Sequence, residues 1–130
     1  MHEILSRRRR GDDERERELQ NDMIREQLQK GRLVQYRAGG DSMYPWVHSG
    51  DCCLIEPAID CDKLEQGDIV FCRLHPYERY VASEITETEV VLETTAGSAR
   101  SRRKYWIGDA DGWCHEEHIY GKYVEVLKYQ

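Results

Sequence analysis

One short stretch of the sequence combines a hydroxyl nucleophile with the small residues that nucleophilic chemistry needs around it. Ser42 follows two glycines within Gly39-Gly40-Asp41-Ser42-Met43-Tyr44-Pro45. Small residues let a substrate backbone approach Ser42 closely, and Pro45 fixes the chain just after it. The Ser42 backbone N–H could donate to an oxyanion. On local spacing alone, an ordinary serine in a glycine-rich hairpin loop is the better interpretation.

Two further stretches extend this pattern along the chain. Leu64-Glu65-Gln66-Gly67-Asp68-Ile69-Val70 places a Gly-Asp pair before an apolar strand, and Ile107-Gly108-Asp109 repeats the pair ahead of residues 112–121. With Gly40-x-Ser42-Met43-x-Pro45 and the following Gly50-Asp51, they resemble, in the same order, the motifs of the LexA-like and type I signal-peptidase-like serine peptidases. The likeness covers roughly residues 32–127, and the first motif is its most specific part.

The resemblance implies a Ser–Lys dyad built on Ser42. The hydroxyl would attack a peptide carbonyl while a neutral lysine, or a histidine in some members, takes its proton. In the family this base lies on a strand soon after the Gly-Asp strand, which matches Ala82 or Ser83 here. Neither side chain can accept the proton, because alanine does not titrate and a serine hydroxyl is too weakly basic. We therefore expect an inactive or impaired peptidase, whether by nature or by substitution.

A base from elsewhere in the chain is the remaining alternative. None of the other basic side chains matches the family position; the candidates are His75, Lys104, Lys122, His115 and His118.

The resemblance also implies a substrate groove around the first motif. Its expected members are Gly40, Asp41, Met43, Pro45, Trp46 and Val47. Met43 is expected mainly to pack beneath the nucleophile, whereas Trp46 and Val47 fit the groove and the core equally well. Asp109 could orient groups near the site, although a turn-forming role explains it as well.

The expected activity is acyl transfer on a peptide bond of a peptide or protein substrate, at a small residue, with the substrate added to an exposed strand edge. The substrate could be the chain's own N-terminal arm, so self-processing and a homodimer are open alternatives. The arm's Arg10-Gly11 and Lys30-Gly31 bonds lack a small residue before glycine. Ala38-Gly39 and Ala96-Gly97 have suitable residue types, but the first lies too close to Ser42 to reach the site easily. A different function class is a non-catalytic peptide-binding or assembly module that uses the same groove. A weaker alternative is a nucleic-acid accessory protein that acts through Arg7 to Arg10.

The composition of the chain argues against some classes of function. The chain has 130 residues, with 19 basic and 25 acidic side chains and a net charge of -6, which argues against wholesale wrapping of nucleic acid. No apolar run approaches the ~20 residues of a membrane helix, and we expect no secretory signal because polar sequence follows the basic N-terminus. We therefore expect a soluble cytoplasmic protein.

The cysteines give no sign of a metal site or a disulfide framework. Five are present, an odd number without repeated spacing, which favours reduced thiols. Cys114-His115-Glu116-Glu117-His118 could supply two zinc ligands, but no CxxC pair supplies the others. We expect no metal and no cofactor.

The chain divides into residues 1–31, a basic tail with a charged helix, and 32–130, a β domain. Asp12 and Asp13 could cap a helix that ends near Gly31. Leu19, Met23, Ile24 and Leu28 form its apolar stripe at helical spacing. We interpret the arginine run before it, residues 7–10, as a solvated tail.

Short strands separated by Gly and Asp turns predict a mainly β fold, a coiled antiparallel sheet or partial barrel of the LexA C-terminal domain and signal peptidase type. Residues 96–103 are rich in Ser, Arg and small side chains and are expected to form a mobile loop. The expected strands span residues 33–36, 52–55, 68–74, 79–85, 89–94, 104–108 and 122–129.

Overall fold

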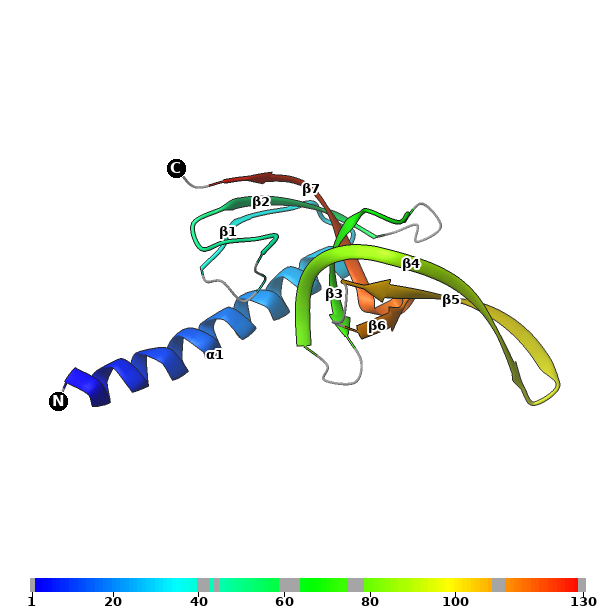
Figure 1. The fold of residues 1–130 in the computed structure, drawn as a ribbon, viewed down its shortest axis with the longest axis horizontal. Coiled ribbons are helices and arrows are strands. Elements are labelled where there is room, and N and C mark those ends of the chain that lie inside the picture. The colour runs from blue at the N-terminus through cyan, green and yellow to red at the C-terminus, as the bar shows by residue number, and fades with distance from the viewer. Residues whose placement is uncertain are drawn as a thin grey trace.

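The computed structural model describes residues 2–39, 43, 45–58, 64–74, 79–108 and 112–128, with the backbone alone at 2–14 and 95. It confirms a mainly β fold. The chain forms one antiparallel seven-stranded sheet that is not closed, and one α-helix near the N-terminus (Figure 1). The helix, α1, spans His2–Gln29. A short 3-10 turn, η2, spans Glu116–His118.

The strands alternate buried and exposed residues wherever one face of the sheet meets the core. Their order across the sheet is β1-β2-β7-β3-β4-β5-β6, so β7 lies between the second and third strands. The strands are β1 (Val34–Arg37), β2 (Cys52–Pro57), β3 (Ile69–Leu74), β4 (Arg79–Thr95), β5 (Ser98–Ile107), β6 (Gly112–His115) and β7 (Ile119–Leu127).

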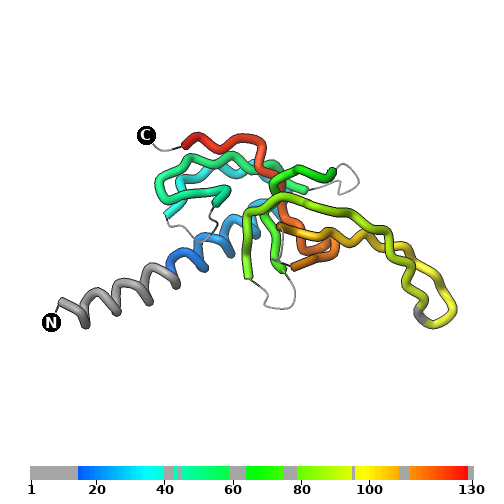
Figure 2. The backbone as a smooth tube through the Cα atoms, viewed as in Figure 1, coloured from blue at the N-terminus to red at the C-terminus, as the bar shows by residue number. Residues whose placement is uncertain are grey.

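The prediction of a mobile loop at 96–103 is wrong. The strands expected at 79–85 and 89–94 form one continuous strand, β4. After a turn at Ala96 and Gly97, β5 pairs with β4, beginning with Ser98 opposite Thr95. Both turn residues have positive φ, 51° and 82°, which suits the twist of a two-residue hairpin. Residues 98–103 belong to the strand because they pair in register with residues 90–95 of β4, most of which favour strands. The hairpin projects from the body (Figure 2).

The helix also differs from its expected form. It begins at His2, because the sequence from there to Gln29 has no proline and only one glycine to stop it. The expected stripe is split: Ile24 and Leu28 are 4% and 2% exposed, whereas Leu19 and Met23 are 62% and 66% exposed. Only the C-terminal part of α1 packs on the sheet, and the N-terminal part points away from it (Figure 1).

Polar contacts fix the docked part of α1. The Tyr80 hydroxyl donates to the Asp22 carboxylate, and the Arg25 guanidinium lies 5.7 Å from the Tyr80 ring centroid and 5.9 Å from that of Tyr120. Burial, with the Asp22 bond, raises the pKa of Tyr80 to about 12. The helix is therefore tied to β4 close to positions 82 and 83.

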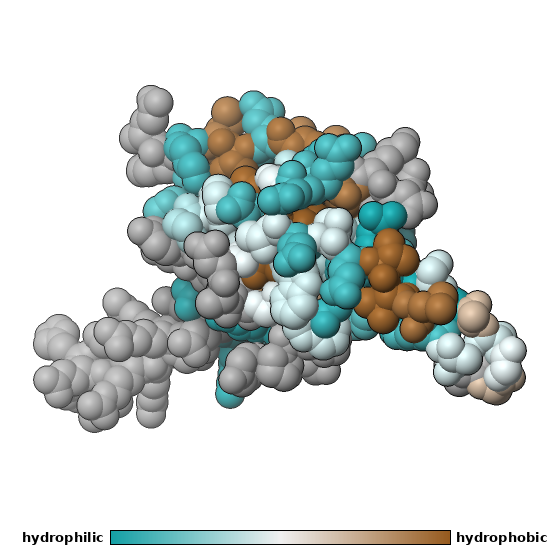
Figure 3. Space-filling model, turned by 45° about the vertical axis from the view of Figure 1, so that its right-hand side comes forward, coloured by the Kyte–Doolittle hydropathy of each residue, from teal (hydrophilic) through white to brown (hydrophobic). Residues whose placement is uncertain are grey.

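The buried residues form two clusters. One lies between α1, the β1–β2 connection and the sheet, and contains Met43, Val47 and Ala82. The other lies under β5, β6 and η2, around Tyr105 and Cys114. Exposed hydrophobic side chains remain on the projecting hairpin, at Val90 and Leu92, where Figure 3 shows a hydrophobic patch. Within the described residues, α1 is too polar to cross a membrane and there is no other long helix.

Candidate functional site

The first motif lies in the connection from β1 to β2, residues 38–51. Gly40, Asp41 and Ser42 fall outside the described residues, as do Asp109 of the third motif and His75. The ends of the connection pair with each other: the Ala38 N–H donates to Asp51 O at 2.8 Å, and the Gly50 N–H donates to Ala38 O at 2.8 Å. The loop is thus closed at its base like a hairpin.

A buried carboxylate organises the second half of this loop. Asp51 is 1% exposed, and its Oδ2 accepts the His48 N–H at 2.8 Å. Lys128 Nζ, from the chain after β7, lies 3.1 Å from the same oxygen and 2.7 Å from Trp46 O. One carboxylate and one ammonium therefore hold the segment that follows the expected nucleophile.

This arrangement gives a testable expectation for stability. Asp51→Ala leaves the His48 N–H and the Lys128 ammonium without their buried acceptor, so we expect the free energy of unfolding to fall by about 2 kcal/mol. Urea denaturation measures the loss. Lys128→Ala is the matched control, and it should cost less than about 1 kcal/mol because Lys128 is half exposed. Equal losses from the two substitutions would contradict the organising role of Asp51.

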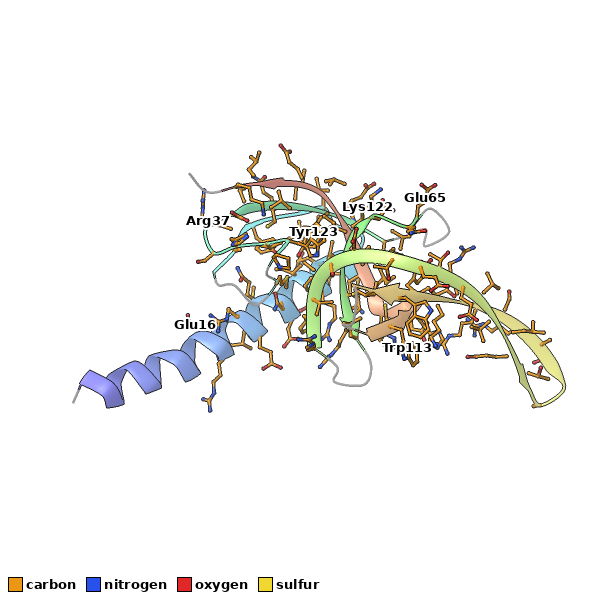
Figure 4. The ribbon with its side chains drawn as sticks, viewed as in Figure 1. Glu16, Arg37, Glu65, Trp113, Lys122 and Tyr123 are labelled. Carbon is orange, nitrogen blue, oxygen red and sulfur yellow. The ribbon has the colours of Figure 1, made fainter. Side chains whose placement is uncertain are left out.

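Below the loop, Met43 packs into the core, where the sequence analysis expects it. It is 5% exposed, and the Tyr123 hydroxyl donates to its Sδ at 3.3 Å. The Tyr36 and Tyr123 hydroxyls are 3.1 Å apart, and burial raises the pKa of both well above the ordinary range. Both phenols therefore stay protonated and act as donors rather than as bases. Tyr123 lies between the sheet and α1 (Figure 4).

The loop also reaches the strand where the resemblance expects the base. The Trp46 indole Nε1 donates to Ser83 Oγ at 3.1 Å, across 37 residues of sequence. Ser83 is 5% exposed, and Ala82 is 3% exposed within the same cluster as Met43. Of the other expected groove residues, Val47 is a core residue and Pro45 is exposed. The first motif and the base position thus meet in space.

The other basic candidates are engaged away from this contact. Lys104 Nζ lies 4.4 Å and 4.2 Å from the ring centroids of Trp106 and Trp113. Lys122 Nζ binds Asp68 Oδ1 at 3.3 Å. Lys122 and Ser83 each pair with Val70 from opposite sides, so their backbones are about 10 Å apart, two strand spacings.

His115 lies on β6, and His118 lies in η2. His115 stacks edge-on against Trp113 on β6, with the ring centroids 5.2 Å apart, and His118 ends η2. Neither belongs to the cluster that contains Met43 and Ala82.

The segment from Cys114 to His118 does not assemble a metal centre. The Cys114 thiol is buried in the second core cluster, and His115 directs its ring toward Trp113. Across the described ranges, no three His, Cys, Asp or Glu side chains are placed to hold one ion.

Sequence reasoning missed two contributors to this region. Lys128 belongs to no motif, and nothing in its local sequence indicates the contact with Asp51. Asn21 carried a signal: it precedes Ile24 by three residues and Leu28 by seven, so helical spacing puts it on the buried face. It is 8% exposed.

Comparison with known proteins adds no relative to this picture. No protein-family model, curated protein or solved structure matches the chain significantly. We therefore infer function from the motif residues and from the contacts of the β1–β2 connection.

Proposed function

We propose that this chain is a serine-peptidase-like domain of the LexA and signal-peptidase type, with Ser42 in the nucleophile position and its general base missing. The observation that carries the proposal is the Trp46–Ser83 hydrogen bond. It holds the loop of the first motif against the strand position where the family keeps its base. Two segments that only the resemblance connects are therefore neighbours in the fold.

The missing base limits the expected activity. A positioned general base contributes about 10²–10⁴ in rate, and Ala82 and Ser83 supply none. Lys104 and Lys122, the two lysines considered for the role, are held by aromatic rings and by Asp68. The expected reaction is thus a slow acyl transfer from a peptide bond to the Ser42 hydroxyl.

An incomplete strand edge supports a peptide as the substrate. Residues 79–84 of β4 pair with β3 on one side, while β5 covers the other side only from Ile85 onward. The Gly108 N–H donates to Glu84 O from the side away from β3. Backbone groups of every second residue in a strand point to the same side, so the N–H and C=O of Ala82 also point away from β3. No strand among the described residues pairs there. An extended peptide could pair with this edge once the side chains that cover Ala82 move apart.

The chain itself offers an exposed bond of suitable residue types. Ala96-Gly97 forms the exposed tip of the projecting hairpin (Figure 2). A small residue before glycine at such a tip is accessible to the site of another copy.

The test is labelling of the full chain with a fluorophosphonate, followed by mass analysis. We expect slow incorporation of one label, located on Ser42 and lost in Ser42→Ala. Labelling that continues at the same rate in Ser42→Ala would contradict the assignment of the nucleophile.

A non-catalytic peptide-binding or assembly module is the second candidate. The observation that favours it is the pair Ala82 and Ser83, buried and without a titratable group where the base is expected. An unlabelled, intact chain that still binds extended peptides would support this function.

A further inference from the structure

We propose that Trp46 is a gate on the open edge of β4, and that Lys128 keeps this gate closed. The ligand of the gated edge is the extended peptide of the proposed function, on which this inference rests. A peptide that adds to residues 79–84 must therefore displace one named side chain, and a second contact regulates how easily that side chain leaves.

The position of Trp46 follows from two contacts on opposite faces of β4. Its side chain packs against the first core cluster, which contains Ala82. Its indole Nε1 donates to Ser83 Oγ at 3.1 Å. Adjacent residues of a strand point to opposite faces, and Val81 and Ile85, which share the face of Ser83, belong to the other cluster. The indole therefore reaches from one face of β4 to the other.

Only one edge of β4 lets the indole pass. On the β3 side, Ala82 pairs with Phe71 and Ser83 pairs with Val70, so that edge is closed. On the opposite side, β5 pairs with β4 only from Ile85 onward. The indole therefore lies over the open edge at positions 82 and 83, which are only 3% and 5% exposed.

The indole covers this edge without replacing a strand. Tryptophan offers one N–H donor and no acceptor, and Trp46 gives its donor to Ser83 Oγ. A paired strand would offer Ala82 both an acceptor for its N–H and a donor for its C=O. A peptide that displaces the indole therefore makes two hydrogen bonds with Ala82 where it breaks one.

A lysine holds the main chain of the gate in place. Lys128 Nζ donates to Trp46 O at 2.7 Å and lies 3.1 Å from Asp51 Oδ2. Asp51 is 1% exposed at the base of the loop, whereas the side chain of Lys128 is 53% exposed. Movement of one exposed side chain therefore releases Trp46 while the base of the loop stays closed.

An NMR titration of the isotope-labelled full chain tests the gate. The probe is acetyl-Ala-Val-Ala-Val amide, and the control peptide is acetyl-Ala-Pro-Ala-Pro amide, whose prolines lack the N–H groups that strand pairing needs. We expect only the valine peptide to shift the indole N–H signal of Trp46. The indole signals of Trp106 and Trp113, which lie on either side of Lys104, should stay in place.

Two substitutions should open the gate. Trp46→Phe removes the N–H donor and part of the ring, and it should bind the valine peptide about fivefold more tightly, because one hydrogen bond no longer has to break. Lys128→Ala releases the main chain and should tighten binding by about twofold or more. Trp113→Phe makes the same exchange on β6 and should leave the affinity unchanged. Thermal unfolding checks that each variant folds.

Equal affinity in Trp46→Phe and Trp113→Phe, or peptide binding that leaves the Trp46 indole signal unshifted, would overturn the inference. Equal binding of the proline peptide, or no binding of the valine peptide to Trp46→Phe, would also overturn it. The gate and the chemistry can fail separately. Tighter binding by Trp46→Phe without fluorophosphonate labelling of Ser42 would keep the gate and remove the peptidase function. Labelling of Ser42 with a peptide affinity that does not respond to Trp46→Phe would remove the gate and keep that function.

Discussion

Ser83→Lys is expected to raise the rate of fluorophosphonate labelling at Ser42 by at least about 100-fold over the unsubstituted chain. The substitution restores a base at the position that Trp46 already holds against the loop of the first motif. Position 83 is 5% exposed, and burial lowers the pKa of a lysine, which leaves more of it neutral near pH 8. A general base contributes about 10²–10⁴ in rate, and we take the lower end because the site was not selected for it.

The controls separate a base from a change of shape. Ser83→Met adds a side chain of similar length without an amine and should leave the labelling rate unchanged. Ser42→Ala combined with Ser83→Lys should abolish labelling. Equal rates for Ser83→Met and Ser83→Lys would show that no proton transfer takes place at position 83.

Ala82→Lys tests the neighbouring alternative. Ala82 pairs with Phe71 and lies in the first core cluster, so a lysine there meets packed apolar side chains. We expect lower stability and no gain in labelling, measured on the same probe and by thermal unfolding. A gain at position 82 larger than at position 83 would reassign the base position.

Gly121→Ala is expected to lower the free energy of unfolding by about 3 kcal/mol. Gly121 lies on β7 opposite Pro57 of β2 and Phe71 of β3. A Cβ added there would be 2.5 Å from Ile55 Cγ2, 2.8 Å from Glu56 O and 3.0 Å from Leu28 Cδ1. The Glu56 oxygen cannot move aside without breaking the β2–β7 pairing. Leu28 is one of the buried residues that pack α1 against the sheet.

The matched control is Gly39→Ala, at which the nearest atom to the added Cβ is Gln20 Oε1 at 3.8 Å. It should change stability by less than about 0.5 kcal/mol. Urea denaturation of both variants gives the comparison. A Gly121→Ala protein within about 0.5 kcal/mol of the parent would show that α1 and β2 do not approach Gly121 as closely as described.

The strands were largely predictable because their signals are local. Cys52–Pro57 and Ile69–Leu74 follow Gly-Asp turns, which mark where each strand begins. The segment 98–103 was not predictable in this way, since Ser and Arg have weak strand preference and their place depends on pairing with residues 90–95 of β4 across the hairpin. Tertiary pairing decided that segment.

The candidate site depends on the resemblance rather than on local signals. The resemblance expects the first motif to lie near Ala82 or Ser83, and the Trp46 indole donates a hydrogen bond to Ser83. The clamp made by Asp51 and Lys128 joins residues 77 positions apart, and such a contact leaves no local pattern. The split of the helix stripe follows from how α1 crosses the sheet, which helical periodicity alone does not specify.

The most direct measurement is the distance between Ser42 Oγ and the introduced amine nitrogen in a crystal structure of Ser83→Lys. We predict about 3 Å, the hydrogen-bond distance between a nucleophile and its base, with the Ser42 hydroxyl open to the strand edge of β4. A Ser42 hydroxyl turned into the packed core, or one more than about 6 Å from that nitrogen and beyond bridging by one water, would contradict it.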